Sequence, residues 1–326
     1  MNHKKIADLA HVSPSTVSKA LAGSSEVSRD VSERIRRIAI ECGYFKEKNK
    51  RKREYSNNKS IFIAVLVPEL LGLHYSETVT RLKNEIEAKG ANVAIYVYDF
   101  DQAKMNDILK NIILLGTTDG VIIFDSPKLS VEPNIPIVCV TNTPPSNFDS
   151  IGNDTDAYMN DCVAYLKGLG HTDIAFVGEL HTLYKYDAFE KAMTANDLVC
   201  KDSFVHTVNA RLEAIGAEAA KRIIENEKKP TAIIAAYDVV ALSLIHELTE
   251  NGIRVPDDIS VMGINNISAA AYAQVPLTTV DIFSEEQYHT AVEILFSKIF
   301  EETNSIRHIT IDHKIIERAS TKRLEK

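Results

Sequence analysis

The sequence predicts an α/β protein with an N-terminal three-helix head of the helix-turn-helix kind and a larger, two-lobed body with two parallel sheets. Residues 1–44 show three short amphipathic segments, and residues 61–326 alternate apolar runs with helical patterns in two rounds. The charge is also divided, because residues 1–60 hold 14 Lys and Arg against 7 Asp and Glu, a balance of +7. Since the net charge of the chain is −8, residues 61–326 carry −15. A basic head on an acidic body indicates a nucleic-acid-binding module, and a solvated basic arm is the alternative.

The bulk composition excludes several classes of protein. The 326 residues suffice for two or three domains, and 45% hydrophobic with 25% charged residues is ordinary for a soluble globular protein. No apolar run approaches the roughly 20 residues of a membrane span, and the N-terminus has no apolar signal core. Cys42, Cys139, Cys162 and Cys200 form no C-x-x-C pair, which suits a reducing cytosol. We therefore expect a cytoplasmic protein with no cofactor and no metal.

The head is expected to hold three helices. Lys4–His11 forms the first, Ser15 caps a second over Ser15–Ala22, and Ser28 caps a third that ends at Gly43. In the helix-turn-helix plan the second helix enters the major groove of DNA, although a three-helix core without that function has the same pattern. Short hydroxyls and a cation on the second helix favour DNA binding, because they reach phosphates and base edges: Ser15, Thr16, Ser18 and Lys19.

The body is expected to alternate strands and helices. The predicted strands are Ile61–Val67, Val93–Tyr98, Gly120–Phe124, Ile137–Val140, Ile174–Val177, Phe204–Val208, Ala232–Ala235, Ile259–Gly263, Thr279–Ile282 and His308–Ile316. The predicted helices are His74–Lys89, Gln102–Leu115, Thr155–Leu169, Tyr184–Asn196, Arg211–Asn226, Val239–Asn251 and Glu285–Glu301. A break at Pro144-Pro145 separates two similar halves, with the last elements crossing back between them. Ligands of such folds bind outside the carboxyl ends of the strands, here in the cleft between the halves.

The head also indicates a family. Lys5-Ile-Ala-Asp-Leu-Ala-His-Val-Ser-Pro-Ser-Thr-Val-Ser-Lys-Ala-Leu-Ala-Gly, followed by Val27-Ser28 and Gly43-Tyr44, resembles the headpiece of the LacI/GalR (lactose-repressor) family. The resemblance implies that bases are read by Pro14, Ser15 and Lys19, and that phosphates are held by Ser13, Thr16, Ser18 and Ser28. Lys19 stands where the family usually has Arg. Because Lys offers a point charge instead of a bidentate fork, a different operator preference is expected.

Residues 46–60 form a basic segment that is poor in apolar residues. In the family this hinge folds into a short helix on the minor groove and inserts a Leu between base pairs. Here Arg53 stands at the Leu position, or Tyr55 if the segment is about two residues longer. We expect a looser clamp on phosphates by Lys50, Arg51 and Arg53, and a mere linker is the alternative.

The resemblance extends through the body. Gly252-Ile-Arg-Val-Pro-Asp-Asp-Ile-Ser-Val-Met-Gly263 is similar to part of the periplasmic-binding-protein-like sensor of the family. The resemblance implies a headpiece at residues 1–45, a hinge at 46–60 and an effector-binding and dimerisation domain at 61–326. Within that domain we expect an N-lobe at about 61–152 and 283–308 and a C-lobe at about 153–282 and 309–326.

The resemblance also places effector-binding positions at His74, Tyr75, Asp154, Lys185, Arg211, Tyr237, Asp238 and Asn265. Lys185 replaces an Arg, Asn265 replaces an Asp, and Arg211 stands at an often aromatic position. These changes make the expected cleft more positive by about two charges, so an anionic effector such as a sugar acid or sugar phosphate is expected. The alternatives are drift at the surface, with Arg211 facing water, and a degenerate cleft with a protein co-regulator.

An enzyme is the rival class, but the chain has no G-x-x-x-x-G-K-[ST], G-x-G-x-x-G, H-E-x-x-H or G-x-S-x-G motif. A transport-type solute-binding protein would need an export signal. We therefore expect a sequence-specific repressor of a carbohydrate-utilisation operon, controlled allosterically by a small molecule or, alternatively, by a protein co-effector. Its expected partners are a second copy in a homodimer and a roughly palindromic double-stranded operator, with no membrane.

Overall fold

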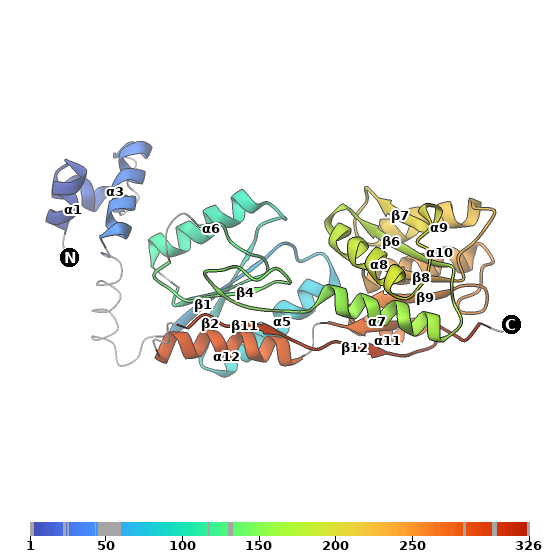
Figure 1. Cartoon of the computed structure of the whole chain (residues 1–326). Helices are drawn as coiled ribbons and strands as arrows, with labels where there is room; N and C mark the ends of the chain where they lie inside the picture. The colour runs from blue at the N-terminus through green and yellow to red at the C-terminus, as the bar shows by residue number, and fades with distance from the viewer. Residues whose placement is uncertain are drawn as a thin grey trace. The chain divides into compact units, whose positions relative to one another are not determined.

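The computed structural model describes residues 3–21, 24, 26–42, 44, 60–116, 118–129, 133–282, 285–301 and 305–324. The helices are α1 (His3–Ala10), α2 (Pro14–Leu21), α3 (Arg29–Glu41), α5 (Leu73–Ala88), α6 (Gln102–Leu115), α7 (Thr155–Gly168), α8 (Leu183–Ala195), α9 (Glu213–Glu225), α10 (Asp238–Glu250), α11 (Ser268–Tyr272) and α12 (Glu285–Glu301) (Figure 1). The strands are β1 (Ile61–Val67), β2 (Ala91–Val97), β3 (Gly120–Ile123), β4 (Ile137–Val140), β5 (Asp149–Gly152), β6 (Ile174–Glu179), β7 (Val205–Val208), β8 (Ala232–Ala235), β9 (Ser260–Ile264), β10 (Thr278–Asp281), β11 (His308–Thr310) and β12 (Lys314–Ile316). Two short 3-10 helices are η1 (Leu180–Thr182) and η2 (Asp202–Phe204).

The chain divides into two compact units. The first contains residues 1–68, 84–138 and 295–304, and the second contains residues 69–83, 139–294 and 305–326. No helix in the described part of the chain is long and apolar enough to cross a membrane.

The head packs α1, α2 and α3 around a small apolar core formed by Ile6, Ala7, Ala10, Val17, Ala20, Ile35 and Ala39. Helix α1 ends because His11 adopts a left-handed conformation, φ 51°, and the Val12 N–H donates to the Ala7 carbonyl at 3.0 Å. The second helix begins one residue earlier than predicted, and its cap is Ser13 instead of Ser15. Pro14 belongs to its first turn, where a missing N–H costs nothing.

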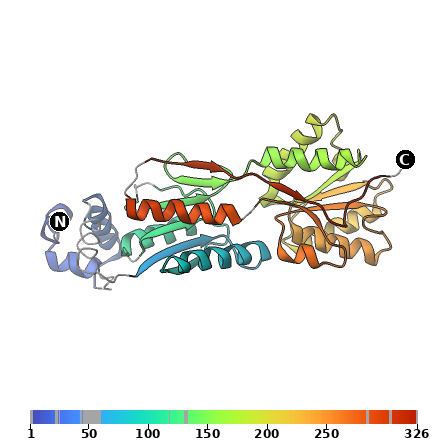
Figure 2. The same ribbon diagram turned by 90° about the horizontal axis from the view of Figure 1, so that it is seen from below.

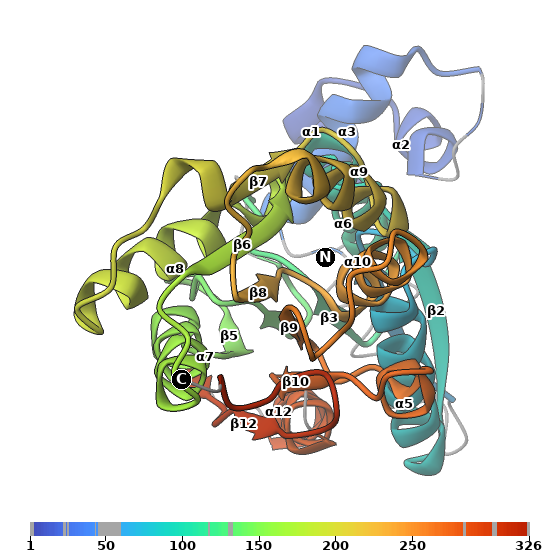
Figure 3. The ribbon, with the colours of Figure 1, turned by 90° about the vertical axis from the view of Figure 1, so that its right-hand side faces the viewer.

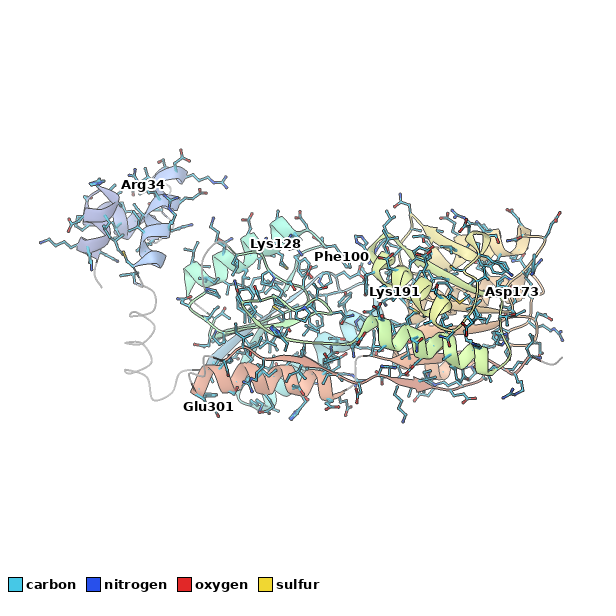
Figure 4. All side chains as sticks on the ribbon, in the orientation of Figure 1. Arg34, Phe100, Lys128, Asp173, Lys191 and Glu301 are labelled. Atoms are coloured by element: carbon cyan, nitrogen blue, oxygen red, sulfur yellow. The ribbon has the colours of Figure 1, made fainter. Side chains whose placement is uncertain are left out.

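Two arginines of α3 tie the head together. Arg34, labelled in Figure 4, donates from Nη2 to the Ala10 carbonyl at 3.1 Å, and Arg36 donates from Nη2 to the Ala20 carbonyl at 3.4 Å. Both acceptors lie in the last turns of α1 and α2, where carbonyls lack partners within the helix. Arg34 therefore fastens α3 to the end of α1, and Arg36 fastens it to the end of α2.

The first sheet has the strand order β11-β5-β4-β3-β1-β2. β1 pairs in parallel with both β2 and β3, and β11 pairs in parallel with β5. The continuous apolar run of β1 is buried from Ile63 to Val67, as expected for a central strand of a parallel sheet. α6 has the predicted bounds, because Asp101 accepts from the Ala103 and Lys104 N–H groups and Gly116 ends it with φ 60°.

The second sheet has the strand order β12-β10-β9-β8-β6-β7. α7 and α8 lie on one face, and α9 and α10 lie on the other (Figure 3). Along β6 the side chains alternate between these layers: Ile174 and Phe176 pack with α7 and α8, whereas Ala175 and Val177 pack with α9 and α10. Only the short edge strand β12 runs antiparallel to its partner β10, so the sheet is largely parallel, as predicted.

The body also has elements that the sequence did not predict. β5 was not predicted, because its residues Asp-Ser-Ile-Gly are mostly polar or small, yet all four are buried. The single strand predicted over His308–Ile316 is two strands that join different sheets: β11 pairs with β5, and β12 pairs with β10 (Figure 2). The short helix α11 was also missed, since five residues are too few for a periodic pattern.

Candidate functional site

The exposed face of α2 carries the polar side chains that the sequence singled out. Val17 and Ala20 are buried in the head, whereas Ser13, Pro14, Ser15, Ser18 and Lys19 are exposed and Thr16 is half-buried. Ser28 is exposed directly before α3. One helix therefore has its apolar side fixed in the core and presents hydroxyls and a cation to solvent.

Two of these polar side chains, Ser13 and Thr16, form hydrogen bonds that stabilise the start of α2. The Thr16 N–H donates to Ser13 Oγ at 3.0 Å, and the two hydroxyls lie 2.8 Å apart. Ser13 is thus the N-cap of the helix, and its oxygen is engaged within the head. The Ser15 and Ser18 hydroxyls are not tied in this way by any hydrogen bond recorded among the described residues.

The turn after α2 carries a residue that the sequence analysis did not select. The Ser24 N–H donates to the Lys19 carbonyl at 3.0 Å, and the Glu26 N–H donates to Ser24 Oγ at 3.3 Å. The Glu26 carboxylate forms an ion pair with Lys19 Nζ. The predicted hinge residues Lys50, Arg51, Arg53 and Tyr55 lie outside the described residues.

A pocket lies in the second unit and is lined by Glu69, Gly72, Leu73, His74, Tyr75, Leu212, Tyr237, Asp238, Val239, Asn265 and Ile267. Five of these were predicted from the sequence: His74, Tyr75, Tyr237, Asp238 and Asn265. Its free volume is about 30 Å³, room for little more than one water molecule. Glu69 follows β1, Tyr237 follows β8 and Asn265 follows β9, so these three lining residues stand at the carboxyl ends of parallel strands.

Asp238 holds the floor of the pocket together. Its side chain is fully buried, and its two oxygens accept from Thr279 Oγ1 at 2.5 Å and from the Ile267 N–H at 2.8 Å. Burial raises the pKa of Asp238 to about 6, although these hydrogen bonds oppose the shift. The carboxylate therefore joins α10 to β10 and to the start of α11.

Arg211 holds two carboxylates that the sequence analysis did not include. Its Nη2 donates to Glu69 Oε1 at 2.7 Å, and its Nη1 pairs with Glu179. Glu179 is only 2% exposed, and burial raises the pKa of its carboxyl against the opposing effect of the Arg211 charge. Arg211 is thus paired instead of facing water alone. The surplus positive charge counted from Arg211 and from the Asp-to-Asn change at Asn265 is offset by Glu69 and Glu179.

Lys185 lies behind the pocket wall. It is 2% exposed, its Nζ donates to the Ala236 carbonyl at 2.8 Å, and it lies 4.6 Å from the centroid of the Tyr237 ring. Burial lowers the pKa of Lys185 to about 7, although the Asp238 and Glu179 charges oppose the shift. Its position supports Tyr237 from behind, and it does not line the pocket.

The pocket also contains an unsatisfied acceptor and strained backbone. Asn265 is 7% exposed, and its Oδ1 accepts no hydrogen bond from any residue that the structure describes. Asn265 and Leu212 have φ values of 114° and 52°, a region that costs free energy for residues other than glycine. Burial and the Lys185 charge lower the pKa of His74 to about 3, so its imidazole is neutral at pH 7. A ligand with an N–H or O–H group would satisfy Asn265.

Asp154 is not part of this group. It is exposed, and its carboxylate caps α7 by accepting from the Ala157 N–H at 3.0 Å. The two missed carboxylates had a recognisable signal, because Glu69 and Glu179 both stand at the carboxyl ends of strands, β1 and β6. Glu26 had no such signal, since it lies in a polar turn.

A helix-turn-helix head with an exposed polar second helix, on a body with a pocket at the strand ends, defines a DNA-binding regulator with a ligand-binding domain. Residues 4–47 match the bacterial regulatory proteins of the lacI family, and residues 163–321 match the periplasmic binding protein-like domain. The chain belongs to the LacI family of transcriptional regulators and carries a periplasmic-binding-protein-like domain. It is therefore a regulator and not an enzyme.

Relatives resemble it over nearly their whole length. HTH-type transcriptional repressor PurR of Haemophilus influenzae is 28% identical over 335 residues, which cover 98% of each chain. Catabolite control protein A of Priestia megaterium is 26% identical over 330 residues, 97% of this chain and 98% of that protein. The structure of a LacI family regulator from Enterococcus faecium with bound ribose aligns with a TM-score of 0.71 at 19% identity, over 81% of this chain and 100% of that one.

Proposed function

We propose that the chain is a homodimeric repressor that binds a roughly palindromic operator through α2 and responds to a small molecule in the pocket. The observation that carries the DNA-binding part is the exposed polar face of α2 on a head that matches the lacI family. A two-fold dimer presents two such helices, which is why a palindrome is expected. More specifically, we propose that the protein represses a carbohydrate-utilisation operon and acts in the cytoplasm, on the nucleoid.

The proposed roles follow the exposed surface of the head. Bases are read by Pro14, Ser15 and Lys19, and phosphates are held by Ser13, Thr16, Ser18 and Ser28. Ser13 accepts the Thr16 N–H and shares a second hydrogen bond with the Thr16 hydroxyl, so its own hydroxyl proton can serve a phosphate when Thr16 Oγ1 is the donor of that bond. In this proposal residues 1–45 bind DNA, residues 46–60 form the hinge and residues 61–326 form the sensor. The hinge residues that would clamp phosphates are Lys50, Arg51, Arg53 and Tyr55.

Ser15→Glu should abolish operator selection. The carboxylate would sit on the exposed face in the first turn of α2, where the helix dipole favours it, so the head keeps its fold. It would, however, meet DNA phosphates, and we expect affinity to fall by about 100-fold at 0.1 M salt. The measurement is selection of genomic DNA fragments by the full-length protein, with exposed Ser146→Glu as a charge-matched control outside the head. Equal enrichment of one palindrome by all three proteins would rule out α2 as the reader.

The pocket is proposed to bind an uncharged, hydroxyl-bearing ligand of the sugar class. Asn265 Oδ1 and Glu69 line the pocket and are acceptors for hydroxyl groups, and the rings of Tyr75 and Tyr237 offer flat apolar faces. The Enterococcus faecium regulator with bound ribose supports a ligand of this class. An anionic sugar derivative, predicted from the sequence, is the competing candidate and would have to replace a carboxylate on Arg211.

Binding of such a ligand requires the pocket to open, because about 30 Å³ is far below the roughly 300 Å³ of an ordinary ligand site. The ligand then stabilises the open conformation, and the unequal operator affinities of the two conformations give allosteric control. The small volume also supports the second candidate, in which a protein co-effector controls the chain and the pocket is degenerate.

Glu69→Gln should distinguish the two ligand classes by the sign of its effect. A neutral sugar loses an acceptor for its hydroxyl, so its affinity should fall about tenfold, whereas an anion gains access to Arg211 and should bind more tightly. Calorimetry with neutral monosaccharides and their phosphates measures both. Glu77→Gln, on the same segment but outside the pocket lining, is the control. If no sugar of either class binds the parent protein, the protein co-effector becomes the leading candidate.

A further inference from the structure

The turn that follows α2 is fixed to the helix that carries the proposed base-reading residues. Ser24 bonds the Lys19 carbonyl through its N–H, and its side-chain Oγ accepts the Glu26 N–H. The backbone therefore holds Glu26 near the last turn of α2. From that position its carboxylate reaches Lys19 Nζ, and both side chains are exposed, at 66% and 47%. An acidic group thus lies on the surface where the proposed function brings the phosphates of DNA.

We propose that Glu26 is the positioning and specificity residue of the DNA-binding surface, and that it acts through Lys19. This inference rests on the proposed operator binding by α2. Lys19 is a point charge on a flexible four-carbon stem, so by itself it contacts any phosphate within reach and does not discriminate among bases. Glu26 accepts one of the three Lys19 donors and leaves the other two for a guanine edge.

The same carboxylate lowers affinity for DNA that lacks the correct base. At a wrong site Lys19 could only contact a phosphate, and the paired Glu26 would then stand close to that phosphate and repel it. At a correct site the base edge accepts from Lys19 while the ion pair persists. Glu26 can also accept from a cytosine amino group, so the pair is matched to one or two defined base pairs in each half-site.

The head contains a matched ion pair on α3 that involves neither Lys19 nor Glu26. Arg29 and Glu33 form an ion pair one turn apart on α3, with the Arg29 Nε to Glu33 Oε1 distance at 3.1 Å and both side chains exposed. Glu33→Gln and Glu26→Gln each remove one negative charge from the head. The two variants therefore change the net charge of the head equally and differ in whether Lys19 is released.

The experiment compares full-length parent, Glu26→Gln and Glu33→Gln for binding to the selected operator and to a scrambled duplex across a salt series. For Glu26→Gln we expect scrambled-duplex affinity to rise about fivefold and the log–log salt slope to steepen by about one. We expect the ratio of operator to scrambled affinity to fall by about the same factor, and repeated selection to relax the consensus at one or two symmetric positions. Glu33→Gln should change each quantity less than twofold.

Two results overturn the inference. If Glu26→Gln and Glu33→Gln change DNA affinity and salt slope equally, Glu26 acts only as a surface charge. If Glu26→Gln leaves the ratio of operator to scrambled-duplex affinity and the selected consensus unchanged, Glu26 has no part in specificity. Failure of the proposed function would give a different result: the parent protein itself would not distinguish the operator from the scrambled duplex.

Discussion

Asp238→Ala should lower the free energy of unfolding by about 3 kcal/mol at pH 5. The substitution removes a fully buried side chain and leaves the Ile267 N–H and the Thr279 hydroxyl without their acceptor. Each orphaned buried donor costs about 1–3 kcal/mol. Urea unfolding followed by circular dichroism measures the effect. Asp257→Ala, which removes an exposed carboxylate that pairs with Lys322, is the control and should leave the midpoint in place.

The same carboxyl should make stability depend on pH. The folded-state pKa of Asp238 is about 6, above the ordinary value of about 3.9, so the folded protein holds this proton more tightly than the unfolded chain does. Its contribution is therefore fully present below about pH 4 and is lost as the pH rises through 6, a change on the order of 3 kcal/mol. Asp238→Asn should flatten this part of the stability profile between pH 4 and pH 7.5. A variant profile parallel to that of the parent protein would contradict the assignment.

Arg211→Gln should be the second large effect, a loss of about 2 kcal/mol at pH 7.5. Removing one partner of a buried ion pair costs about 3–5 kcal/mol. That range is reduced here because Arg211 is 35% exposed and water screens part of its charge. The loss arises from Glu179, which is 2% exposed and would keep a buried charge without its cation.

The pH dependence of this loss identifies its cause. Burial already raises the pKa of Glu179, and removal of Arg211 raises it further. Glu179 in the variant should therefore take up a proton more readily than in the parent protein, so the deficit shrinks at low pH and grows as the pH rises. Urea unfolding at pH 5 and pH 7.5 tests this, and the double variant Arg211→Gln/Glu179→Gln should recover most of the stability. An equal deficit at both pH values would mean that lost packing, and not the Glu179 charge, is responsible.

Local patterns predicted the elements that depend on local interactions. The bounds of β1, α6 and α12 agree with the prediction because a buried run, an Asp cap and a helical period are read within one segment. The start of α2 was misplaced by one residue, since Pro14 is equally compatible with lying just before a helix and with being its first residue. β5 was not predicted, because the burial of a polar segment depends on its neighbours in the sheet.

For the pocket, the resemblance predicted which residues come together but not which contacts they make. The resemblance placed His74, Tyr75, Tyr237, Asp238 and Asn265 at one pocket, because they stand at the ends of regular elements whose order fixes their location. It did not reveal that Asp238 is fully occupied by Thr279 and Ile267, nor that Lys185 lies behind Tyr237. Those facts depend on the directions of side chains, which spacing along the chain does not specify.

The sequence by itself determined the class of this protein: the three-helix head with its polar second helix, the basic head and acidic body, and the alternation that gives two largely parallel sheets. Only the tertiary structure decided the electrostatics of the pocket. Arg211 meets Glu179, 32 residues away, and Glu69, 142 residues away, and their carboxylates cancel the positive charge that a count along the sequence assigned to the pocket. The reason is that charge acts through distance in space, and the fold sets that distance.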